Sequence, residues 1–95
     1  MANTRRLVLD VLKPHKPSIL DMAEKLSDIE HVKSVNTILY EIDEKVENIK
    51  ITIVGDDLDY DRIRDSIENL GGSVHSIDEA VCGEDIINEV KTPQG

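Results

Sequence analysis

The chain has 95 residues and a formal net charge of −9, with 39% hydrophobic, 33% charged and only 2% aromatic residues. This length supports one domain over residues 1–95, with a core at about 5–83 and a polar tail at 84–95. The negative charge repels phosphate backbones and anionic membranes, so we expect neither nucleic acid nor a membrane as partner. The single cysteine, Cys82, cannot form an internal disulfide and indicates a cytoplasmic protein.

The first part of the chain predicts a strand and a helix. Residues 5–13 (RRLVLDVLK) alternate, with Leu7, Leu9 and Val11 on one face. The loop with Pro14 and Pro17 ends this strand. A helix is expected from about residue 18 to 28. Ser18 and Asp21 resemble a capping box there, although Pro17 at the first helical position fits as well.

The next segments predict a hairpin, a second helix and a fourth strand. Residues 32–43 and 46–55 alternate on either side of Glu44-Lys45, a turn that would pair Tyr40 with Ile49 and Ile38 with Ile51. The turn lacks glycine, so this register is open to a shift of a residue or two. A helix over about 60–70 then ends at Gly71-Gly72, and residues 73–81 form the last strand.

The order βαββαβ with right-handed crossovers predicts an α+β ferredoxin-like sandwich. Its antiparallel sheet has the strand order 4-1-3-2, with both helices on one face. On the predicted register the other face carries mostly apolar side chains, namely Val8, Leu12, Val35, Thr37, Leu39, Thr52, Val54, Val74 and Ala80. A wide apolar face on a small protein is typical of a subunit interface, so we expect a homo-oligomer that forms through this open face.

Four carboxylates follow the third strand, from Asp56, Asp57, Asp59 and Asp61. Asp59 is placed as the N-cap of the second helix, and Asp61 lies in its first turn, where the helix dipole favours an anion. The spacing also resembles an EF-hand calcium loop, but that loop needs glycine where Arg62 stands. A looser oxygen site for Ca²⁺ or Mg²⁺ remains a hypothesis beside a solvated acidic edge.

The loop LKPHKPS supplies the only local concentration of positive charge. Lys13, His15 and Lys16 lie next to a helix N-terminus, so they could hold an anion or a carboxylate. His75, at the start of the fourth strand, lies at the same end of the sheet and could meet His15. The alternative is a rigid connection whose basic side chains offset Asp43 and Glu44.

The segments LDVLKPHKPS, ILYEIDEKVENIKITIVG, LDYDRI and GGSVHSIDEAVCG resemble a family of small archaeal proteins, number 211 in the series of domains of unknown function. The resemblance implies a ferredoxin-like fold, a cytoplasmic setting and multimeric assembly, with no established activity and no defined catalytic residues.

Three functional hypotheses follow. The first is a non-enzymatic oligomeric module that binds a divalent cation, calcium or magnesium, through Asp56–Asp61, with no organic cofactor. The second is a sensor domain that binds an amino acid or another anion at a subunit interface near Lys13–Ser18. The third, an enzyme that uses His15 and His75, has the least support, because the chain has no phosphate loop, CxxC, HExxH or nucleophile elbow.

Overall fold

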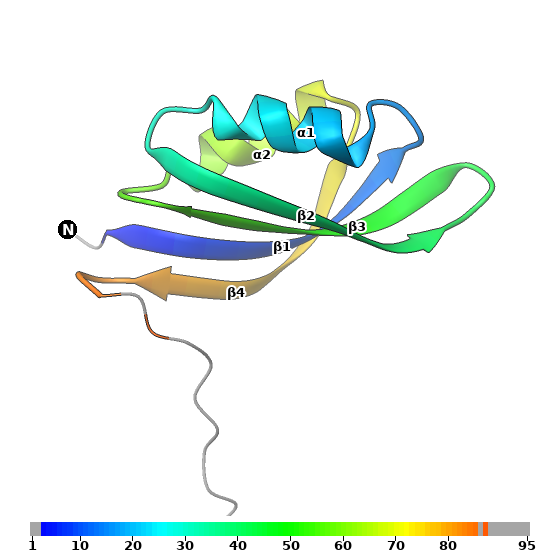
Figure 1. Ribbon diagram of the computed structural model, residues 1–95. Helices are drawn as coiled ribbons and strands as arrows, with labels where there is room; N and C mark the ends of the chain where they lie inside the picture. Colours follow the sequence, from blue (N-terminus) through cyan, green and yellow to red (C-terminus); the bar gives the residue numbers. More distant parts are fainter. Residues whose placement is uncertain (1–2, 86, 88–95) are drawn as a thin grey trace, which may run out of the picture.

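The computed structural model describes residues 3–85 and 87. The elements follow the order β1 (Thr4–Pro14), α1 (Ile19–Ser27), β2 (Val32–Ile42), β3 (Val46–Gly55), α2 (Tyr60–Asn69) and β4 (Ser73–Cys82). They form one antiparallel sheet in the order β2-β3-β1-β4, and both helices cover the same face (Figure 1). This is the predicted ferredoxin-like sandwich. Its strand order is the predicted 4-1-3-2, written here from the other edge of the sheet. The expected tail at 84–95 lies largely outside the described residues.

The core lies between the sheet and the two helices. The central strand β1 contributes Leu7, Leu9 and Val11, all at most 3% exposed, in the predicted alternation. The rest of the buried cluster comes from α1, β3, α2 and the loop before α2. These residues are Met22, Leu26, Ile49, Ile51, Ile53, Leu58, Ile63 and Ile67. Because the chain has no Phe or Trp, this layer of aliphatic side chains is the main source of its hydrophobic stabilisation.

The helices begin where the sequence predicts. The Ser18 side chain accepts a hydrogen bond from the Asp21 backbone N–H, and Asp59 accepts one from the N–H of Arg62. Each bond satisfies a backbone donor that has no partner inside its helix. α2 ends at Asn69 with Leu70 as its C-cap, and Gly71 follows with a φ of 92°, in the left-handed region that glycine tolerates best.

The predicted register of β2 against β3 is wrong over most of its length. Next to the turn, Glu41 pairs with Asn48 and Ile42 with Glu47, as predicted. Tyr40 is then an extra residue in β2, so that Leu39 rather than Tyr40 pairs with Ile49. This bulge moves residues 34–39 by one position and turns them to the opposite face, and a second shift follows between Val32 and Ser34.

The open sheet face is therefore more polar than predicted. Val35, Thr37 and Leu39 pair with the core residues of β3, and the Thr37 hydroxyl donates to the Ile19 carbonyl of α1. Two residues of β4 also move: Val74 packs against the core, and Ala80 pairs with Leu7. Of the predicted apolar set, this leaves Val8, Leu12, Thr52 and Val54 on the open face.

Charged pairs occupy much of the rest of this face. Arg6 on β1 donates to the carboxylate of Glu79 on β4 at 2.8 Å, and the Lys50 ammonium lies 3.5 Å from that of Asp78. Among the described elements, no helix has the length and apolar character needed to cross a membrane.

A test of the two-layer packing compares two leucines of α1. Leu26 is fully buried, whereas Leu20 on the same helix is 65% exposed. Replacing Leu26 by Ala should lower the free energy of unfolding by about 2–5 kcal/mol, because it removes buried methyl groups and leaves a cavity. Leu20→Ala should change it by less than about 0.5 kcal/mol. Urea unfolding followed by circular dichroism measures both, and equal losses would contradict the packing of α1.

Candidate functional site

The acidic loop connects β3 to α2 at one end of the sheet. Three backbone N–H groups fix it: Asp56 N–H donates to the His31 carbonyl, Leu58 N–H to the Thr4 carbonyl, and Asp57 N–H to the side-chain oxygen of Asn3. The loop packs so closely that a Cβ on Gly55 would lie 2.0 Å from the carbonyl oxygen of His31. Only glycine fits at this approach.

Asp56 is neutralised by two cations of the chain. Its carboxylate lies 3.2 Å from the Arg5 guanidinium and 3.0 Å from the Lys33 ammonium. The hydrogen bond from Lys33 and the charges of Arg5 and Lys33 lower the pKa of Asp56. Its place next to two cations makes Asp56 the weakest candidate of the four predicted metal ligands.

The other three carboxylates share one shallow depression. Asp57, Asp59 and Asp61 line it together with Thr4, His31, Leu58 and Tyr60. Asp59 also caps α2, and Asp61 lies 3.5 Å from the Arg64 guanidinium. Within the described part of the chain, no three His, Cys, Asp or Glu side chains come close enough together to hold a metal ion. The depression gathers acidic oxygens without forming a complete coordination sphere in one copy.

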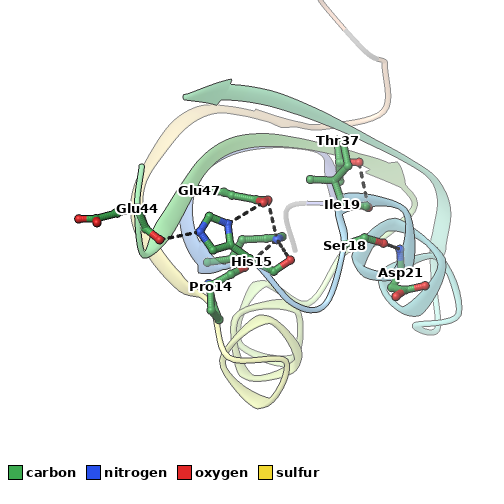
Figure 2. A network of polar contacts seen from close by, with 9 residues as sticks. Pro14, His15, Ser18, Ile19, Asp21, Thr37, Glu44 and Glu47 are labelled. Atoms are coloured by element: carbon green, nitrogen blue, oxygen red, sulfur yellow. Dashed lines mark hydrogen bonds and ion pairs between the residues drawn. The ribbon is translucent and has the colours of Figure 1, made fainter. Parts of the chain in front are cut away.

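At the opposite end of the sheet, the predicted basic loop forms an internal polar network (Figure 2). The Lys13 side chain is fully buried, and its ammonium donates to the Glu47 carboxylate at 2.7 Å and to the Pro14 carbonyl at 2.8 Å. The carbonyl of His15 lies 3.5 Å away. All three donors of the ammonium therefore have acceptors within the chain.

His15 contacts the hairpin through both ring nitrogens. Nδ1 lies 3.1 Å from Oε2 of Glu47, and Nε2 lies 2.9 Å from the Glu44 carbonyl oxygen. The bond to the Glu44 carbonyl and then that to the Glu47 carboxylate raise the pKa of His15. Bonds from Lys13 and His15 lower the pKa of Glu47. These contacts use the groups that we expected to hold an anion.

The two remaining predicted ligands stay apart from this network. Lys16 is exposed, and His75 is an exposed extra residue of β4, between the pairs Asp10–Ser76 and Val11–Val74. Neither side chain makes a hydrogen bond or an ion pair among residues 3–85. The structure thus joins Lys13 with His15 and does not join His15 with His75.

Sequence reasoning missed Glu47, which holds this network together. The signal was present, because Lys13 continues the alternation of Leu7, Leu9 and Val11 and had to be on the buried face. A buried ammonium needs an opposite charge, and Glu47 is the residue directly across the β1–β3 pairing.

Comparison with known proteins gives a family and one close relative. The profile of DUF211, described as "Uncharacterized ArCR", matches residues 5–95. The "Uncharacterized protein MJ0319" of the archaeon Methanocaldococcus jannaschii is 55% identical over 94 residues, which cover 99% of this chain and 97% of the relative. The resemblance drawn from the sequence is confirmed.

The buried ion pair of Lys13 and Glu47 gives a prediction about the stability of the fold. Lys13→Met leaves the Glu47 carboxylate, whose side chain is only 14% exposed, without its main partner. We expect the free energy of unfolding to fall by about 1–3 kcal/mol in denaturant titrations. The matched control Lys16→Met changes an exposed lysine and should have little effect. The double variant Lys13→Met/Glu47→Gln should recover part of the loss. A Lys13→Met protein as stable as the control would contradict the prediction.

The lowered pKa of Glu47 also predicts an acid dependence. Because the folded-state pKa lies below the ordinary value of 4.5, the ionised pair stabilises the fold fully above pH 4.5. This stabilisation is lost as the pH falls through the lowered pKa. The stability difference between the unaltered protein and Glu47→Gln should therefore be constant from pH 5 to 6 and shrink below pH 4. A stability difference that does not shrink in acid would contradict the ion pair between Lys13 and Glu47.

Proposed function

We propose that this chain, which belongs to the DUF211 family, is a non-enzymatic cytoplasmic module that self-associates and binds a divalent cation, Ca²⁺ or Mg²⁺. The observation that carries the proposal is that Asp57, Asp59 and Asp61 line one depression at the acidic end of the sheet. The cation has a structural or regulatory role, and no organic cofactor takes part.

The chemistry of the depression suits a hard cation. Calcium takes six to eight oxygen ligands at about 2.3–2.6 Å, from carboxylates, backbone carbonyls and water. Asp57 and Asp59 have no ion-pair partner among the described residues, and the net charge of −9 adds a long-range attraction for cations. Asp59 keeps one carboxylate oxygen available beyond the one that caps α2.

A single copy does not supply a compact set of three ligands, so we place the cation between copies. Carboxylates from a neighbouring copy would complete the coordination, and cation binding would then favour assembly. The open sheet face is the surface that we propose for self-association. Its mixture of Val8, Leu12 and Val54 with the Arg6–Glu79 and Lys50–Asp78 pairs resembles the composition of interfaces between separately folded subunits.

The basic end supports the sensor hypothesis less well. An anion or amino acid near Lys13–Ser18 would need free donors, but Lys13 and His15 donate to Glu47 and to backbone carbonyls. Binding through Lys13 would have to break its buried ion pair with Glu47 first, which costs several kcal/mol, and this leaves only the exposed Lys16. The geometry therefore favours the cation over the anion.

The test of the cation proposal replaces the three carboxylates of the depression by uncharged amides of the same shape. In the triple variant Asp57→Asn, Asp59→Asn and Asp61→Asn, the helix cap is retained, because asparagine caps as well as aspartate. Calcium at about 100 times its Kd should stabilise the unaltered protein by about 2.7 kcal/mol and should have no effect on the triple variant. Thermal unfolding with and without calcium measures the difference.

The matched control removes three exposed carboxylates from the helices, through Glu24→Gln, Asp65→Asn and Glu68→Gln. This protein has the same net charge as the triple variant and should keep the calcium response. Native mass spectrometry with and without a chelator reports the bound ions and the number of subunits together. The proposal fails if calcium changes neither the unfolding temperature nor the mass of the unaltered protein.

A further inference from the structure

The ring of His15 faces a hydrogen-bond acceptor on each side. Nδ1 points to the Glu47 carboxylate at 3.1 Å, and Nε2 points to the Glu44 carbonyl at 2.9 Å (Figure 2). Neither acceptor can donate at neutral pH, since a carbonyl oxygen never does and the pKa of Glu47 lies below its usual range. A neutral imidazole has a single N–H, so it can make only one of these bonds. The geometry is that of the doubly protonated, cationic ring.

We propose that His15 is a pH-sensitive switch: when protonated, it ties the β2–β3 turn at Glu44 to the loop after β1, and when neutral it releases the turn. The switch needs neither a bound cation nor a second copy of the chain. It is therefore independent of the function proposed above.

The environment decides which of the two bonds is lost on deprotonation. Among the described residues, the charges that act on the ring are those of the Glu47 carboxylate of β3 and the Lys13 ammonium of β1. The Glu44 carboxylate points away from the ring (Figure 2). Lys13 fixes Glu47 and also donates to the Pro14 and His15 carbonyls, so this side of the ring is rigid. The bond to the Glu44 carbonyl is the shorter of the two, at 2.9 Å against 3.1 Å, but an ionised carboxylate accepts a stronger hydrogen bond than a neutral carbonyl does. The remaining proton therefore stays on Nδ1, and the bond to Glu44 breaks.

The β2–β3 turn depends strongly on its hydrogen bond to His15. Residues 41–46 are all exposed, with Ile42 at 66% and Val46 at 37%, so little packing holds them. Within the described residues, the turn itself has the Asp43 N–H to Val46 carbonyl bond and the bond from the Glu44 N–H to the Asp43 side chain. Among residues 3–85, loss of the His15 bond leaves the turn attached through its two strands alone.

The direction of the pH dependence follows from the direction in which the pKa of His15 is shifted. Contacts with Glu44 and Glu47 raise the pKa of His15 above its ordinary value of 6.5. The contribution of the ring to stability is fully present below pH 6.5 and is lost as the pH rises through the raised value. The turn is thus held below pH 6.5 and released as the pH rises above the raised pKa of His15.

Nuclear magnetic resonance of the full chain tests the switch directly. Nitrogen-15 shifts of the imidazole rings report the protonation of each ring nitrogen, and methyl shifts of Ile42 and Val46 report the two sides of the turn. At pH 5.5 both nitrogens of His15 should be protonated. Between pH 5.5 and 8.5 the two methyl groups should titrate with the same midpoint as His15, and above that midpoint Nδ1 alone should carry the proton.

Two glutamine variants complete the test. His15→Gln should abolish the methyl titration, whereas His75→Gln, which changes an exposed histidine outside the network, should leave it unchanged. The proposal is overturned if His15 titrates without any response of the methyl groups, or if its neutral form keeps the proton on Nε2. It is equally overturned if the methyl titration persists in His15→Gln.

Discussion

The positions of Lys13, Glu47 and His15 depend on the burial of one face of β1 under the two helices. Because helices cover only one side of the sheet, alternate residues of β1 must enter the core. Leu7, Leu9 and Val11 satisfy this requirement with apolar side chains, and Lys13 follows in the same alternation. The burial of Lys13 then requires Glu47, and Glu47 in turn positions the ring of His15. A single periodicity thus extends from the core to the network at the end of the sheet.

The order of the elements and the helix starts could be predicted, because they rest on local signals that agree with one another. Strand alternation, the Pro14–Pro17 break and the caps at Ser18 and Asp59 all indicate the same fold. The register of β2 could not be predicted in the same way. Either parity of this strand presents a mixture of apolar and polar side chains, so the pattern does not distinguish the two faces. The extra residue at Tyr40 is decided by packing against α1 and β3.

The acidic end shows a similar division between local and long-range effects. The capping role of Asp59 follows from its own neighbours in the chain. The pairing of Asp56 depends on topology: β3 ends between the start of β1 and the start of β2, which carry Arg5 and Lys33. The predicted strand order places these two cations next to Asp56, and that alone would have removed Asp56 from the predicted metal ligands. The loop therefore consists of carboxylates with different tasks, although they stand next to one another in sequence.

The two tyrosines have a consequence for the spectroscopy of this protein. They are its only Phe, Tyr or Trp residues: Tyr40 lies in β2 near the hairpin, and Tyr60 begins α2 near the other end of the sheet. Tyr40 is the bulge near the β2–β3 turn, with the Lys50 ammonium 5.2 Å from its ring centre, and Tyr60 borders the acidic depression, with the Arg64 guanidinium at 5.8 Å. Without tryptophan, all the intrinsic fluorescence comes from these two rings. A protein with either tyrosine replaced by leucine would carry a single native fluorophore, located at one end of the molecule.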